Sequence, residues 1–127
     1  MKRHNFMLLL AEGFRQRGFV VEEVGGEGAE VGVDLVLSNG NDRFFVNCGQ
    51  WQAEAVDVDS VQELHDAVAA RRAAGGYLVT SGRFTEDAAA LARVHKLHLI
   101  DGQQLVILLD EANETITTGI RVPPRAR

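Results

Sequence analysis

Four residues of this 127-residue chain have side chains and spacings that invite a chemical role. His95 and His98 have the spacing of a metal-binding pair, but they straddle a predicted helix end, and no acidic or cysteine partner is evident. Ser81 invites interpretation as a nucleophile, but it lacks the Gly-x-Ser-x-Gly context of a nucleophile elbow. Cys48 is the single cysteine, which excludes an internal disulfide and a multi-cysteine metal site. We therefore interpret Cys48 as a small buried hydrophobe and assign no chemistry to the other three.

Acidic residues dominate one stretch of the sequence. The chain carries 13 lysines and arginines against 18 aspartates and glutamates, a net charge of −5. Residues 22–66 hold eleven of the acids and a single base, Arg43, a balance of −10. Residues 71–96 and the first 17 residues are each +3. Because proteins that grip nucleic acid usually carry positive charge, we expect any DNA binding to be weak.

The composition indicates one globular domain with a substantial core, since 46% of the residues are hydrophobic. The longest apolar runs, Met7 to Ala11 and Leu105 to Leu109, are about five residues long, whereas a membrane-spanning helix needs about 20. The apolar stretch behind the basic first residues stops at Glu12, too early for a signal peptide. We expect no membrane segment and a reducing, cytoplasmic location.

Hydrophobic periodicity predicts a helix and three strands in the first half of the chain. Apolar residues at helical spacing from Phe6 to Phe14 predict a helix over 5–17, with Gly18 as its stop. Segments rich in β-branched and aromatic residues predict strands over 19–24, 31–38 and 43–48. The sequence Asn39-Gly40 predicts a hairpin between the last two, because Asn-Gly tolerates positive φ.

The second half alternates helices and strands. Ser60 and Glu63 form a capping box that predicts a helix starting near Asp59 or Ser60, and Thr85 is the predicted N-cap of the next helix. The remaining segments are predicted strands over 77–80 and 97–100, a loop over 81–84, a short helix ending near 109 and an edge strand over 116–122. The order αβββαβαβ predicts an α/β fold, with a central mixed sheet flanked by helices on both faces.

Five segments, taken together and in this order, resemble the Mrr-type restriction endonuclease domain, a branch of the PD-(D/E)XK nuclease superfamily. They are GFVV at 18–21, GVDL at 32–35, CGQW at 48–51, VTSGRFTEDA at 79–88 and LIDG at 99–102. The resemblance covers roughly residues 6–109. It implies a restriction-endonuclease-like fold, which we expect over residues 1–110, with 111–127 as a C-terminal tail.

The resemblance also implies where a nuclease site would lie. Asp34 matches the aspartate that binds Mg²⁺ in that family, although it is equally well interpreted as a strand-end residue that bonds nearby amides. Asn47 stands where the family has glutamine or glutamate, and Gly49 stands where it has the catalytic lysine. Met7 occupies the position of a first-helix glutamate. Asp34 and Asn47 would then form a weak or vestigial metal site, with Mg²⁺ as the cofactor of an active enzyme.

These substitutions favour a domain that has lost nuclease activity and serves binding or assembly. The alternative is an active Mg²⁺-dependent DNA endonuclease with a relocated cation, for which Arg71 or Arg72 is a candidate. A third hypothesis is a domain of a larger protein that recognises a protein partner. The apolar run Leu105 to Leu109 and the alternating tail predict either a homodimer that buries both or a tail that folds back over its own helix.

Overall fold

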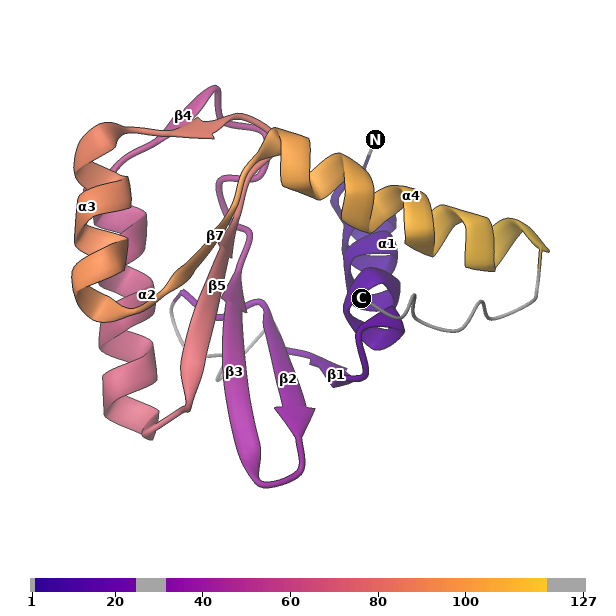
Figure 1. Cartoon of the computed structure of the whole chain (residues 1–127), viewed down its shortest axis with the longest axis horizontal. Coiled ribbons are helices and arrows are strands. Elements are labelled where there is room, and N and C mark those ends of the chain that lie inside the picture. The colour runs from indigo at the N-terminus through magenta and orange to yellow at the C-terminus, as the bar shows by residue number, and fades with distance from the viewer. Residues whose placement is uncertain (1, 25–31, 119–127) are drawn as a thin grey trace.

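A five-stranded mixed sheet organises the computed structural model, which describes residues 2–24 and 32–118 (Figure 1). Its strand order is β1-β2-β3-β5-β7, with β1 and β7 at the two edges. The pairs β1–β2 and β2–β3 are antiparallel, whereas β3–β5 and β5–β7 are parallel. The strands are β1 (Val20–Glu23), β2 (Leu35–Asn39), β3 (Asp42–Asn47), β5 (Gly75–Val79) and β7 (His98–Ile100). The predicted mixed sheet is therefore confirmed.

Turn chemistry and helical crossovers explain the two kinds of strand pairing. Gly40 adopts φ 63° in the two-residue turn between Asn39 and Asp42, which confirms the predicted hairpin. Parallel neighbours need a longer connection, and a helix supplies it in both cases. The helix α2 (Val58–Arg71) joins β3 to β5, and α3 (Glu86–His95) joins β5 to β7.

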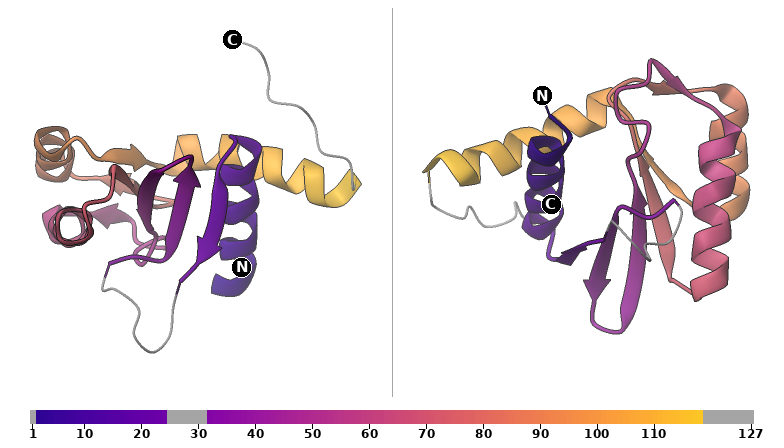
Figure 2. Two further views of the ribbon diagram at one scale, coloured as in Figure 1. Left: turned by 90° about the horizontal axis from the view of Figure 1, so that it is seen from below. Right: turned by 180° about the vertical axis from the view of Figure 1, so that it is seen from behind.

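Helices cover both faces of the sheet (Figure 2). The first helix, α1 (Arg3–Gln16), and the last, α4 (Gly102–Thr118), pack on one face, whereas α2 and α3 pack on the other. The core accordingly has two parts. Side chains from α1 and α4 meet alternate residues of β2 and β3, such as Leu35 and Val46, while α2 and α3 meet the intervening ones, such as Phe45. Each fully buried aliphatic or aromatic side chain stabilises the fold by about 1.5–3 kcal/mol.

The crossing of α1 and α4 depends on a glycine. A Cβ on Gly13 would lie 2.6 Å from Leu108 Cγ and 3.0 Å from the Leu108 carbonyl oxygen. Gly13 lowers the helix propensity of α1, by about 1 kcal/mol relative to alanine, but its missing side chain lets α4 approach. The close contact explains why a glycine stands in the middle of this helix.

Three local predictions were wrong. The capping box does not form, because Ser60 lies inside α2 and the Asp57 carboxylate caps the helix by accepting the Val58 N–H. Residues 83–84, predicted as loop, form β6 (Arg83–Phe84), which pairs in parallel with β4 (Ala55–Val56). The short helix predicted to end near residue 109 is α4, which continues to Thr118, so 116–118 are not a strand, and the rest of that predicted strand lies outside the described residues.

Candidate functional site

Asp34 lies directly before β2, at the end of the sheet where β3 and β5 finish. Its hydrogen bonds connect it to the strands on both sides of β2. Its backbone N–H donates to the Val46 carbonyl of β3 at 2.7 Å, and its carbonyl accepts the Val24 N–H, just after β1, at 3.1 Å. Its carboxylate Oδ2 accepts the Cys48 N–H at 2.7 Å. The side chain thus acts as the acceptor for a backbone amide beyond the end of β3. This contact fulfils the strand-end interpretation of Asp34, whereas its role as a metal ligand stays a prediction.

Asn47 and Gly49 contact each other directly. The Asn47 side chain is 5% exposed, and its Oδ1 accepts the Gly49 N–H at 3.0 Å. Gly49 lies in the exposed turn after β3, and a Cβ added there would stand 3.6 Å from Asn47 Oδ1, an ordinary contact distance. The backbone at Gly49 therefore has room for the lysine that the family resemblance implies.

Met7 is a core residue. It is 4% exposed, and its Sδ lies 3.2 Å from the buried Cys48 Sγ. One residue earlier, Phe6 stacks on Trp51 with ring centroids 4.2 Å apart. The helix α1 therefore presents apolar side chains where a first-helix glutamate would be expected. Cys48 therefore contacts both Asp34, through its backbone N–H, and Met7, through its thiol.

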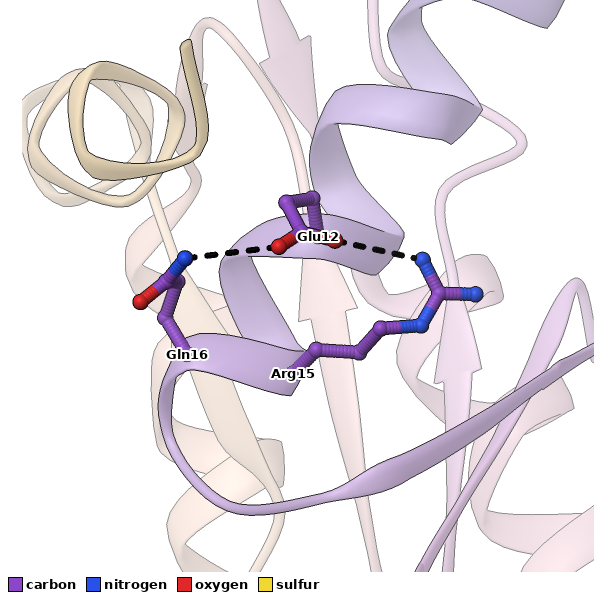
Figure 3. Close-up of polar contacts among 3 residues, drawn as sticks. All are labelled: Glu12, Arg15 and Gln16. Carbon is purple, nitrogen blue, oxygen red and sulfur yellow. Dashed lines mark hydrogen bonds and ion pairs between the residues drawn. The ribbon is translucent and has the colours of Figure 1, made fainter. Parts of the chain in front are cut away.

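Helix α1 does carry a carboxylate, but elsewhere. Glu12 accepts a hydrogen bond from Gln16 at 3.3 Å and pairs with Arg15 at 3.4 Å (Figure 3). Glu12 is five positions after Met7, which places the two side chains about 140° apart around the helix. Glu12 is thus the neighbour of Gly13 at the α4 crossing and does not take the place of Met7.

The donor set at this edge does not fit Mg²⁺. One carboxylate, one amide oxygen already bonded to a backbone N–H and one buried thioether replace the several oxygen ligands that Mg²⁺ prefers. Within the described part of the chain, no group of three or more histidine, cysteine, aspartate or glutamate side chains could hold a metal ion.

The loops around the site are bound tightly together. The Ser81 hydroxyl donates to the Trp51 carbonyl at 2.6 Å, so it closes a loop contact. A Cβ on Gly82 would clash with the Ala53 carbonyl oxygen, and one on Gly102 would clash with the Ser81 carbonyl oxygen. These two glycines were not singled out from the sequence. In the sequence, their role is indicated only by their position, since Gly82 follows Ser81 in a predicted loop and Gly102 follows Asp101 in a predicted turn.

The two histidines of the metal-spacing motif point to different neighbours. His95 stacks on His65 of α2 with centroids 3.6 Å apart, whereas His98 stacks on Tyr77 of β5 with centroids 4.9 Å apart. The structure thus separates the pair.

Outside the candidate site, the pKa of the Asp57 carboxyl is lowered by the Val58 N–H and then by the Thr85 hydroxyl.

Solved structures identify this arrangement as a restriction-endonuclease-like fold. The chain is similar to AF1548, a protein of unknown function, with a TM-score of 0.67 and 16% identity over 86% of this chain and 66% of that one. It is also similar to the MspJI restriction endonuclease in complex with a 27-mer oligonucleotide, with a TM-score of 0.56 and 21% identity over 98% of this chain and 34% of that one.

The chain belongs to the Mrr restriction endonuclease family, whose catalytic-domain model, described as restriction endonuclease, matches residues 1–109. It is 29% identical over 109 residues to the type IV methyl-directed restriction enzyme EcoKMrr of Escherichia coli (strain K12). That match covers 83% of this chain but 35% of the relative's length. Across residues 2–24 and 32–118, no helix is both long and apolar enough to cross a lipid bilayer.

Proposed function

We propose that this chain is an Mrr-family domain that no longer cleaves DNA and serves binding or assembly. The observation that carries the proposal is at position 49, where a glycine replaces the lysine and donates its N–H to the one oxygen of Asn47 that a metal would need. Phosphodiester cleavage requires positive charge at the developing oxyanion. Neither Gly49 nor the thioether of Met7 supplies it.

The charge distribution supports weak DNA binding. The segment 22–66, with its balance of −10, includes Asp34, Asn47 and the loop that follows them, so phosphates approaching this edge meet net repulsion. The MspJI structure contains an oligonucleotide, and EcoKMrr is a methyl-directed restriction enzyme by name. These relatives support duplex DNA as the ligand class, with an affinity that falls steeply with salt.

The alternative, an active Mg²⁺-dependent endonuclease, needs a cation from another part of the chain. Arg71 and Arg72 lie at the end of α2, about 20 Å along a 14-residue helix from Val58. The chain there returns to the start of β3, since the Ala74 N–H donates to the Arg43 carbonyl. Both arginines therefore lie near the opposite end of the strands from Asp34. Arg83 of β6, whose N–H donates to the Glu54 carbonyl in the loops beside the site, is the better candidate.

A cleavage assay separates these two functions. Supercoiled plasmid, methylated or unmethylated, is incubated with the protein and Mg²⁺ or Mn²⁺, and we expect no nicking. Asp34→Asn is the matched control, because its amide oxygen can still accept the Cys48 N–H while the negative charge is lost. Nicking by the wild type that disappears in Asp34→Asn and in Arg83→Ala would establish the active enzyme and overturn the proposal.

Assembly is the second part of the proposal. Val106 and Ile107 of α4 are 58% and 55% exposed, and the helix extends beyond the predicted domain boundary at residue 110. We propose a domain that includes α4 and a homodimer or protein-partner contact through this helix. Light scattering at micromolar concentration tests the dimer, and a mass near 13.9 kDa would exclude it. We also propose a cytoplasmic location, because a single cysteine that forms no internal disulfide is typical of proteins in a reducing compartment.

A further inference from the structure

A column of aromatic rings crosses the sheet away from the candidate site. Tyr77 of β5 and His98 of β7 are register partners, and their rings stack at 4.9 Å with an angle of 23° between the planes. Phe14, Phe19 and Phe44 surround the other sides of Tyr77 at tilted or edge-on angles, with centroids 5.3–6.3 Å away. These contacts fix the tyrosine ring, and through it the imidazole, in one orientation.

The column ends at an open edge of the sheet. His98 is exposed, and β7 is the last strand in the sheet order, so no further strand from residues 2–24 and 32–118 covers it (Figure 1). Tyr77 and Phe44 are half-buried on the face that α1 covers in part. Phe44 lies three residues before Asn47 on β3, about 10 Å along the strand. The column is therefore separate from the end of the sheet where Asp34 lies.

Positive charge accompanies the rings. Burial raises the pKa of Tyr77, and the positive charge of the exposed Arg17, the C-cap of α1, partly opposes that rise. Lys96, also exposed, precedes His98 by two residues. Both belong to the parts of the chain whose charge balance is positive. A ligand at His98 would meet an exposed imidazole on a segment of the chain whose charge balance is positive.

Planar rings joined by an anionic backbone are the partner that fits this combination. Single-stranded nucleic acid offers its bases for stacking, whereas a duplex keeps them paired and stacked inside. We propose that the exposed imidazole of His98, held in place by its stacking on Tyr77, is a stacking surface for unpaired bases of single-stranded nucleic acid, with the positive charges of Lys96 and Arg17 attracting the backbone phosphates. This inference goes beyond the proposed function and needs neither cleavage nor its loss.

Fluorescence anisotropy with labelled oligo(dT) and oligo(rU) tests the proposal, and the two probes distinguish DNA from RNA. We expect His98→Ala to bind about 5- to 150-fold more weakly, the equivalent of the ~1–3 kcal/mol that one stacked base contributes. His98→Phe should retain binding, because it keeps an aromatic ring. Val94→Ala, which removes a 72% exposed apolar residue of α3, is the matched control and should bind like the wild type.

Salt dependence tests the role of the cation. For single strands, each phosphate contact adds about 0.7 to the slope of log affinity against log salt, so Arg17→Gln should lower the slope by about that amount. Chemical-shift changes on adding the oligonucleotide should centre on Tyr77 and His98. Absence of wild-type binding at low salt, or equal binding by His98→Ala, would overturn the proposal. So would a change in oligomeric mass in His98→Ala, since the column would then be a contact between copies. The plasmid assay is unaffected by either result.

Discussion

Replacing Met7 by glutamate is expected to cost about 4 kcal/mol more stability at pH 7 than replacing it by glutamine. Met7 is 4% exposed and packs against Cys48, so a carboxyl introduced there is buried without a cation beside it. Such a carboxyl stays protonated in the folded chain. Holding a group with an ordinary pKa of about 4.3 in its neutral form at pH 7 costs ~3.7 kcal/mol, at ~1.36 kcal/mol per pH unit. Glutamine loses the same apolar contacts but has no proton to hold.

Urea denaturation of Met7→Glu and Met7→Gln at several pH values measures this difference. Because burial raises the folded pKa of the introduced carboxyl, the penalty is absent below about pH 4.3 and grows as the pH rises. The two variants should thus be equally stable near pH 4 and differ by about 1 kcal/mol at pH 5. Equal stability at pH 7, together with tighter Mg²⁺ binding by Met7→Glu, would refute the reasoning. Position 7 would then belong to a solvated metal site shared with Asp34.

Three further predictions concern other parts of the fold. Gly13→Ala should lower the melting temperature despite its better helix propensity, because overpacking against Leu108 costs about 1–3 kcal/mol against a gain of about 1; a higher melting temperature would contradict the α1–α4 crossing. Asp57→Ala should destabilise the protein at pH 7, with the loss shrinking below about pH 3.8, since the Val58 N–H and then the Thr85 hydroxyl lower the folded pKa of that carboxyl. Gly49→Lys should change the free energy of unfolding by less than about 1 kcal/mol, since the position is exposed and open; a large loss in denaturant titration would count against that geometry.

Elements with a strong local signal could be predicted from the sequence. The apolar spacing from Phe6 to Phe14 indicated α1, and Asn39-Gly40 indicated the hairpin, because each pattern is specified by neighbouring residues. The strands β4 and β6 were missed because they are two residues long and exist only by pairing with each other. The alternation of Ile116 and Thr118 was misleading, since the helix begun at Gly102 continues through both.

The candidate site was predictable in position but not in geometry. The resemblance located Asp34, Asn47 and Gly49, and the structure brings them together at one edge of the sheet. Sequence alone did not reveal that Cys48 would connect Asp34 to Met7, because that contact joins residues 41 positions apart. Whether an apolar first-helix residue faces the site or the core is decided by such long-range packing.

The hydrogen bonds of Asp34 bear on how a nuclease site decays. Gly49 lies in an exposed turn and bonds Asn47 only through its backbone N–H, so a lysine or a glycine can stand there with little effect on folding. The Asp34 carboxylate accepts the Cys48 N–H just beyond the end of β3. Substitution by an apolar residue would leave that amide without this acceptor. Selection for a folded domain alone would therefore be enough to retain Asp34. In this chain, the carboxylate of Asp34 thus contributes to folding whether or not the domain cleaves DNA.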